Sequence, residues 1–225
     1  MSRRKLARAA FMLLCLAACA AAQVESRAPS AQAKPPGAFQ KAEQTGAVTS
    51  AVFDFEQNGF AYHIAANGNG RRTKGDKTRR FNLRLDRGDH IESIYFSEHD
   101  GDLLLACGVT DEESGIGLIV RLEQPSMRAL WSRQIPAFNT GEPLRAGSRL
   151  YVTGIGFVGA LDIKTGEYAW KHEGLYGRGR EGAFNSFVAP EMKGEEVLFK
   201  ELPVYNVPAK TIVVSRKTGN LVRIE

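Results

Sequence analysis

A nine-residue segment occurs twice in this 225-residue chain, and the repeat limits the folds available to it. Glu123–Trp131 (EQPSMRALW) aligns without a gap on Asp162–Trp170 (DIKTGEYAW), 39 residues further along the sequence. Each copy has an acidic residue, a turn, and then a strand-like stretch that ends in tryptophan. Recurrence at a spacing of about 20 to 50 residues indicates supersecondary units that stack on one another.

Two further markers extend the repeat toward the C-terminus. Ser215–Val222 again contains Lys-Thr-Gly, although its strand-like stretch ends differently. Ala137–Thr140 (AFNT) matches Ala183–Ser186 (AFNS) at an offset of 46 residues. The longer offset is explained by Tyr176–Gly182 (YGRGREG), which is typical of a loop insertion.

The markers divide the chain into four units of about 40 residues, each predicted to hold three or four short strands. For the first unit the predicted strands are Ser50–Glu56, Phe60–Ala66 and Arg80–Asp86. For the second unit they are Ile91–Ser97, Asp102–Thr110, Gly117–Glu123 and Arg128–Gln134. The third unit is predicted to have a weak first strand without clear bounds, followed by Arg149–Thr153, Phe157–Ile163 and Glu167–His172. The fourth unit is predicted to have Asn185–Ala189, Glu195–Leu202, Thr211–Ser215 and Asn220–Ile224. Four short strands per unit predict an all-β fold, a small β-propeller of about four four-stranded blades.

The third unit resembles the quinoprotein-type (PQQ-like) propeller repeat. Gly159-Ala160-Leu161-Asp162, Thr165-Gly166 and Trp170 match that repeat; the second unit matches in part and the fourth weakly. Because that family usually has seven or eight blades, the resemblance implies either a compact four-bladed disc or an incomplete, open propeller. Trp131 and Trp170 are expected to pack between neighbouring sheets, because large aromatic side chains are usually part of the core.

The resemblance also has functional implications. Quinone-cofactor dehydrogenases use a much larger propeller, and many carry a vicinal cysteine pair; this chain has neither, so no cofactor is expected. Propeller lipoproteins of the outer-membrane barrel-assembly type are similar too, but have more blades. That likeness implies a scaffold that binds another envelope protein.

The sequence Gly154-Ile-Gly156-Phe-Val-Gly159 spells a dinucleotide-binding motif, but its context does not fit one. Such a motif requires a helix that begins at the third glycine and holds a pyrophosphate at its N-terminus. Here the apolar stretch after Gly159 reaches only Ile163 before a turn, and the next residues alternate polar and apolar. The pattern predicts strand, turn and strand.

The N-terminus has the features of an export signal. Arg3, Arg4, Lys5 and Arg8 precede an apolar stretch, Ala9–Ala22, that is too short to span a membrane. Leu16-Ala17-Ala18-Cys19 resembles a bacterial lipobox, which implies lipid attachment at Cys19 and, because Ala20 follows, sorting to the outer membrane. Alternatively, cleavage after Ala22 would release a soluble periplasmic or secreted protein. The predicted organisation is a signal peptide at 1–19, a flexible tether at 20–46 and a β-propeller domain at 47–225.

Removal of the signal changes the charge and the cysteine content. The whole chain has a net charge of +5, and without the four basic signal residues 26 basic residues face 25 acidic ones, or +1. A net charge of +1 gives no overall positive electrostatic field that would attract nucleic acid, so nucleic acid is not expected as a partner. Cys107 is left without a disulfide partner, and its apolar surroundings indicate a buried thiol rather than a nucleophile.

Candidate functional residues are few. His63, His90, His99 and His172 lack metal-ligand spacing, and no catalytic, cofactor-binding or metal residues are predicted. Two basic, glycine-rich loops are candidate partner-binding sites, through Arg71, Arg72 and Lys74 in the first and Arg178 and Arg180 in the second. We therefore expect a non-enzymatic envelope propeller that binds another protein. The alternatives are a periplasmic inhibitor or immunity protein that caps an enzyme, and a ligand-binding protein or enzyme that uses the propeller channel.

Overall fold

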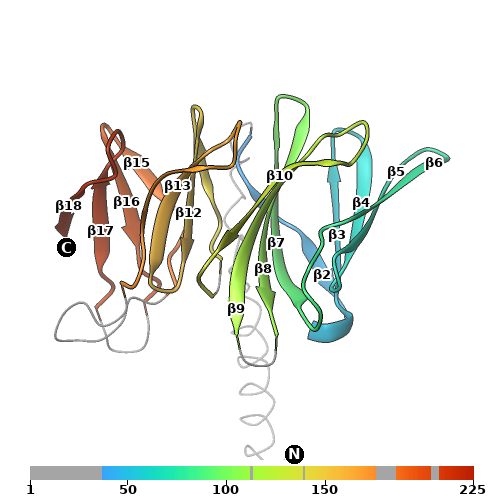
Figure 1. Cartoon of the computed structure of the whole chain (residues 1–225), viewed down its shortest axis with the longest axis horizontal. Helices are drawn as coiled ribbons and strands as arrows, with labels where there is room; N and C mark the ends of the chain where they lie inside the picture. The colour runs from blue at the N-terminus through green and yellow to red at the C-terminus, as the bar shows by residue number, and fades with distance from the viewer. Residues whose placement is uncertain (1–36, 112–113, 139, 176–185, 204–207) are drawn as a thin grey trace, which may run out of the picture. The chain divides into compact units, whose positions relative to one another are not determined.

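The fold is described from a computed structural model, which covers residues 37–111, 114–138, 140–175, 186–203 and 208–225 (Figure 1). These residues are almost entirely β-structure, with one 3-10 turn at Val48–Ser50. Within the same ranges, no helix is long and apolar enough to cross a membrane.

The strands form four antiparallel sheets that follow one another along the chain. The first sheet has five strands, in the order β2 (Glu43–Thr45), β3 (Val52–Gln57), β4 (Phe60–Ala65), β5 (Asn69–Lys74), β6 (Lys77–Asn82). The second sheet also has five, in the order β1 (Gln40–Lys41), β7 (His90–His99), β8 (Asp102–Thr110), β9 (Gly115–Leu122), β10 (Ala129–Ile135). The third sheet has four strands, in the order β11 (Leu144–Ala146), β12 (Arg149–Gly154), β13 (Phe157–Asp162), β14 (Tyr168–His172). The fourth sheet also has four, in the order β15 (Glu191–Lys193), β16 (Glu196–Lys200), β17 (Thr211–Ser215), β18 (Leu221–Ile224). The predicted all-β fold of four repeated sheets is confirmed.

Three details of the strand prediction were wrong or incomplete. The basic stretch predicted as a loop in the first unit forms the β5–β6 hairpin, and β6 ends at Asn82 instead of continuing to Asp86. The first strand of the fourth sheet is Glu191–Lys193, later than predicted. Two strands, β1 and β2, lie within the segment 20–46 that was expected to be a tether, and they pair with β7 and β3.

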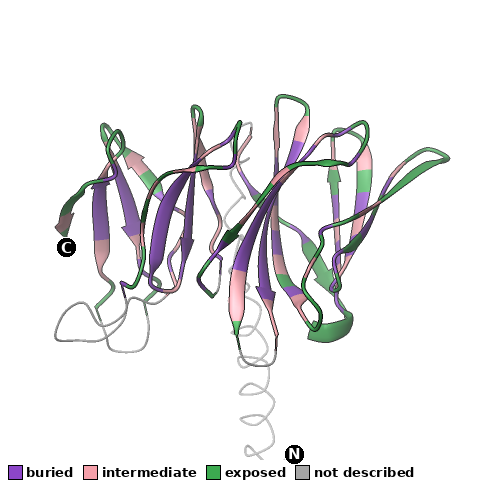
Figure 2. Cartoon of the chain, viewed as in Figure 1, coloured by how far each residue is buried: buried purple, intermediate pink, exposed green. Residues whose placement is uncertain are grey.

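Consecutive sheets share hydrophobic cores. One cluster joins the first and second sheets, a second joins the second and third, and a third joins the third and fourth. β8 is buried on both faces (Figure 2), because Leu103 and Leu105 pack toward the first sheet while Leu104 packs toward the third. Among the described residues no such cluster joins the first and fourth sheets, so the propeller-like series is open between them.

The two tryptophans close the boundaries between sheets, which explains the repeat in the sequence. Trp131 on β10 donates its Nε1–H to the Ile163 carbonyl at 2.9 Å, and its ring lies over Gly166. Trp170 on β14 lies over Gly219 in the same way, and both glycines have a φ near +70° that favours glycine. The prediction that both tryptophans are structural is confirmed.

The residue two positions after each tryptophan also contacts the turn of the following sheet. Arg133 donates its Nε–H to the Gly166 carbonyl at 2.8 Å, and His172 Nε2 lies 2.6 Å from the Gly219 carbonyl. The gap-free repeat in the sequence is therefore a repeat of contacts from each sheet to the turn of the following sheet.

The glycine motif at 154–159 is a strand connection, as predicted. Gly154 ends β12, Gly156 occupies the turn with a φ of +69°, and Gly159 lies inside β13. No helix begins at Gly159, so the dinucleotide-binding alternative is excluded.

Candidate functional site

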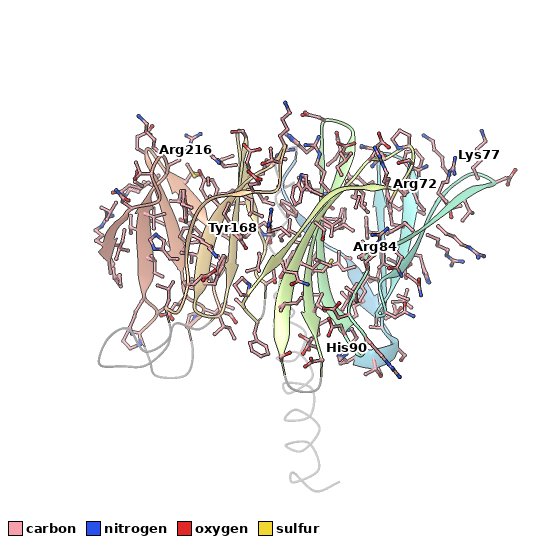
Figure 3. The ribbon with its side chains drawn as sticks, in the orientation of Figure 1. Arg72, Lys77, Arg84, His90, Tyr168 and Arg216 are labelled. Carbon is pink, nitrogen blue, oxygen red and sulfur yellow. The ribbon has the colours of Figure 1, made fainter. Side chains whose placement is uncertain are left out.

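The β5–β6 hairpin is the most strongly charged part of the described chain. Residues 69–84 include seven basic residues and one acidic residue, Asp76. Gly75 and Asp76 form a two-residue turn, and the glycine has a φ of +54°. Figure 3 shows Lys77 at the tip of this hairpin and Arg84 nearer its base.

One of the three loop residues singled out in the sequence has a structural role. Arg72 is only 9% exposed, and its Nη1 donates to the Gln124 carbonyl while its Nη2 lies 3.5 Å from the Pro125 carbonyl. Its guanidinium also lies 4.3 Å from the centre of the Phe60 ring. Arg72 therefore fastens the first sheet to a turn of the second and is not available to a partner, which corrects the prediction for this residue.

The remaining basic side chains of the hairpin are exposed. Among the described residues none of them forms an ion pair; they are Arg71, Lys74, Lys77, Arg79, Arg80 and Arg84. Lys74 contacts the Phe60 ring, with its Nζ 4.5 Å from the ring centre. We call these six residues the basic surface. Like charges this close repel one another, so a partner that neutralises them would gain binding energy.

On the outer face of the first sheet, charged residues form a row across the strands. Glu43, Asp54, His63, Arg71 and Arg80 are successive cross-strand neighbours, so the row changes from acidic to basic. Two of its members are linked, since the Nδ1 of the histidine lies 2.8 Å from the Oδ1 of the aspartate. A cavity of about 380 Å³ lies at the basic end of the row, and it can accommodate an anionic group.

A larger cavity of about 580 Å³ lies between the first and second sheets, and we call it the first groove. Its apolar lining includes Phe81, Leu118 and Met127, and its basic lining consists of Arg84 and Arg128. It contains no acidic lining residue. The groove therefore combines apolar and positively charged surface at one boundary between sheets.

Backbone geometry also marks the first groove. Four described residues other than glycine have a positive φ, and two of them, Arg84 at +56° and Met127 at +58°, line this groove. Such conformations cost about 1 to 3 kcal/mol each, and they are found disproportionately at binding sites. The amide of Arg84 donates to Asn82 Oδ1 at 2.6 Å, which helps to hold that conformation.

The sequence contained one signal for this groove that was not used. The gap-free alignment of the two nine-residue segments places Met127 opposite Gly166, at a position where glycine is favoured. The second sheet therefore presents a methionine side chain where the third presents a bare backbone. A tryptophan from the preceding sheet could not lie against it as Trp131 lies against Gly166.

The fourth sheet differs from the second and third at the tryptophan position. Arg223 on β18 stands at the position of Trp170, and its guanidinium pairs with Glu196 at 2.7 Å and with Glu225 at 2.5 Å. Hydrogen bonding from Arg223 lowers the pKa of Glu196. Lys200 and Glu191 form another pair on this sheet at 2.9 Å. The position that holds a tryptophan in the second and third sheets is therefore charged and ion-paired in the fourth.

The edge strand β18 carries the other notable surface of the fourth sheet. Leu221, Val222 and Ile224 are exposed to between 46% and 49%. An exposed apolar edge strand can pair with another chain. It is a second candidate contact surface, but it bears no charge pattern that indicates a type of partner.

Other chemically reactive groups are dispersed. Within the described ranges, no three of the His, Cys, Asp and Glu side chains gather closely enough to hold a metal ion. His99 Nε2 lies 3.3 Å from Asp100 Oδ2, and burial lowers the pKa of the histidine. Cys107 is completely buried, as predicted, and burial raises the pKa of its thiol to about 12.

The other residues singled out in the sequence cannot be placed. Cys19, Arg178 and Arg180 lie outside the described residues, so the lipid-attachment and second-loop predictions stay predictions. Of the first loop, Arg71 and Lys74 belong to the basic surface and Arg72 does not; partner binding by Arg71 and Lys74 stays a prediction.

The fold and the site define an all-β protein with an open, propeller-like series of four antiparallel sheets and a basic hairpin in the first. No protein-family model matches the sequence, and no curated protein matches it either. Solved propeller structures do match, at low sequence identity. Quinohemoprotein alcohol dehydrogenase from Comamonas testosteroni is 10% identical with a TM-score of 0.51, and the match covers 84% of this chain and 37% of the dehydrogenase.

Two other solved structures are similar at lower scores. The computationally designed Ika8 protein is 11% identical with a TM-score of 0.49, and the match covers 82% of this chain and 61% of Ika8. BamB from Moraxella catarrhalis is 14% identical with a TM-score of 0.35, and the match covers 83% of this chain and 67% of BamB. The chain thus spans less than two thirds of Ika8 and of the dehydrogenase. The similarity to the dehydrogenase supports the propeller-like fold and says nothing of activity.

Proposed function

We propose that this chain is a non-enzymatic protein of the cell envelope that binds another protein through the basic surface. The observation that carries the proposal is the set of six exposed basic side chains without ion pairs within the described structure. On the fourth sheet, by contrast, Lys200 pairs with Glu191, and Arg223 pairs with Glu196 and Glu225. The basic surface has no such internal compensation and is the better candidate for a contact.

The charge distribution supports an acidic partner. Residues 69–84 carry a net charge of +6, whereas the chain without its signal carries only +1. The rest of that chain is therefore acidic by about five charges, and the positive potential is concentrated on one hairpin. Such a patch steers an acidic surface toward it and fixes the orientation of binding.

The envelope location rests on the N-terminal sequence. The signal-like segment and the lipobox-like Leu16–Cys19 support export, followed by lipid attachment at Cys19 and sorting to the outer membrane. Release after Ala22 is the alternative. If Cys19 carries the lipid, the residues between it and β1 would let the domain reach a partner at some distance from the membrane.

A capture experiment with matched variants tests this proposal. The tagged mature protein is incubated with envelope extract, and bound proteins are identified by mass spectrometry. Lys77→Glu/Arg80→Glu reverses charge on the basic surface, and Lys164→Glu/Lys217→Glu makes the same change in net charge at exposed positions elsewhere. We expect a partner that is lost from the first variant and retained by the second. Equal retention by both variants, or turnover of a metabolite by the pure protein with no partner recovered, would refute the proposal.

A further inference from the structure

The free edge of β6 borders the first groove. At the boundaries between the second and third sheets and between the third and fourth, a tryptophan lies over a glycine of the following sheet, and the first sheet has no such tryptophan. In the second sheet, Trp131 stands opposite Arg121 on the adjacent strand, and both donate to the Ile163 carbonyl of the third sheet. In the first sheet, Arg79 stands opposite Arg72 in the corresponding register. The tryptophan position is therefore occupied by an exposed arginine, and β6 lacks the contact that Trp131 makes to the following sheet.

The same comparison explains why the groove stays open on its other side. Arg72 donates to the carbonyl of Gln124, which aligns with Ile163 in the repeat. The inner part of this boundary therefore has the same hydrogen bond as the boundary between the second and third sheets. Beyond that contact, Met127 replaces the glycine on which a tryptophan would lie. The boundary is closed near the core and open toward the edge strands.

The backbone of β6 is suited to accept another strand. β6 is the last strand of the first sheet, so one of its edges has no strand neighbour in the described structure. In a two-residue hairpin the residues that flank the turn, here Lys74 and Lys77, form a hydrogen-bonded pair. Alternation then directs the backbone N–H and C=O groups of Thr78 and Arg80 toward the free edge.

The side chains around this edge specify what an added strand would carry. A strand beside β6 would present alternate side chains to the first groove, where the partly buried Phe81 supplies apolar surface and Met127, which also lines the groove, is 4% exposed. Its other side chains would lie beside Arg80 and Arg71 on the outer face of the first sheet. Apolar residues suit the first set of positions and acidic residues suit the second.

From this geometry we infer that the first groove and the free edge of β6 bind an extended segment of the partner in which acidic and apolar residues alternate. The segment adds a sixth strand to the first sheet, and its acidic side chains pair with Arg71 and Arg80 of the basic surface. This inference rests on the proposed function and names the partner's chemistry. Backbone hydrogen bonds supply affinity in this mode, and alternate side chains supply specificity.

Fluorescence anisotropy with a labelled synthetic peptide tests the inference on the mature protein. The probe is a peptide of about eight residues in which valine and glutamate alternate, and the control replaces each glutamate with lysine. Two protein variants separate backbone pairing from charge. Thr78→Pro removes the N–H at the free edge without changing charge, and edge strands tolerate proline at such a position. Thr78→Val keeps the N–H and serves as its matched control.

The expected results are specific. The glutamate peptide binds, the lysine peptide binds at least about tenfold more weakly, and Thr78→Pro weakens binding by about tenfold while Thr78→Val does not. Far-UV circular dichroism and the urea midpoint of both variants stay close to those of the parent, which excludes unfolding as the cause.

Three results would overturn the inference. The glutamate peptide and the lysine peptide could bind equally, or Thr78→Pro could bind as well as Thr78→Val. Single-stranded oligothymidylate could also bind as tightly as the peptide and compete with it, which would identify a general polyanion surface. If strand addition fails in this assay while Lys77→Glu/Arg80→Glu still loses the captured partner, the proposed function stands and only the inference about its mode is wrong.

Discussion

The contact between Trp131 and Gly166 leads to a quantitative prediction. A Cβ atom at Gly166 would lie 2.5 Å from Trp131 Cδ2, and the backbone there has a φ of +71°. An alanine in this backbone conformation costs about 1 to 2 kcal/mol. The steric overlap with the ring adds about 1 to 3 kcal/mol, which is typical of overpacking in a core. We expect Gly166→Ala to lower the free energy of unfolding by about 2 to 5 kcal/mol.

Gly194 provides the matched control for this substitution. It has a φ of +61°, and nothing lies within 4 Å of a Cβ built on it, so Gly194→Ala should cost only the backbone term. In a Trp131→Ala background the steric term disappears, and Gly166→Ala should then cost about as much as the control. Urea unfolding followed by far-UV circular dichroism measures all these free energies without relying on tryptophan fluorescence. If Gly166→Ala costs no more than Gly194→Ala in the parent protein, the tryptophan does not seal this boundary.

Three further predictions concern buried polar groups. Because burial raises the pKa of Cys107 to about 12, its thiol should not react with iodoacetamide at pH 8 in the folded chain beginning at Ala20, and should react fully in urea. Burial lowers the pKa of His99, and Arg145 Nη1 lies 3.2 Å from its Nδ1, so the unfolded state binds a proton more readily. The free energy of unfolding should therefore fall as pH decreases from about 6.5, and His99→Gln should flatten that decrease in urea titrations at several pH values. Arg72→Met should destabilise the domain by about 1.5 to 3 kcal/mol in the same assay, because it removes a charged donor from the Gln124 carbonyl; an unchanged midpoint would contradict this structural role.

The repeat explains why the general fold could be predicted. Each tryptophan must lie against a glycine in the next sheet, so Trp131, Gly166, Trp170 and Gly219 remain visible as a spaced pattern in one sequence. The inner strands β8, β12 and β13 are buried on both faces, which gives them continuous apolar runs such as Leu103–Cys107.

The first sheet could not be predicted as well, for a physical reason. β5 and β6 consist largely of Arg, Lys, Asn and Gly, a composition with low intrinsic preference for strands, so they were interpreted as a loop. Their ladder is supported by contacts that a local pattern does not show, above all the link from Arg72 to the second sheet. β1 and β2 were missed because they are only two and three residues long.

The basic surface was only partly predicted, and the first groove was not. Arg71 and Lys74 were singled out by charge, but charge could not distinguish them from Arg72, which is buried. The groove depends on two replacements at one boundary, Arg79 for a tryptophan and Met127 for a glycine. Their effect becomes visible only when the register of all four sheets is known.

Photo-cross-linking in the envelope tests most directly whether the partner contacts the hairpin. A photoreactive amino acid is placed at Lys77 at the tip of the hairpin, at Val222 on the apolar edge of the fourth sheet, or at Lys217 on an exposed turn. We predict that irradiation gives one protein adduct from the Lys77 position and none from the other two. An adduct from Val222 or Lys217 with none from Lys77 would contradict the assignment of the hairpin as the binding surface.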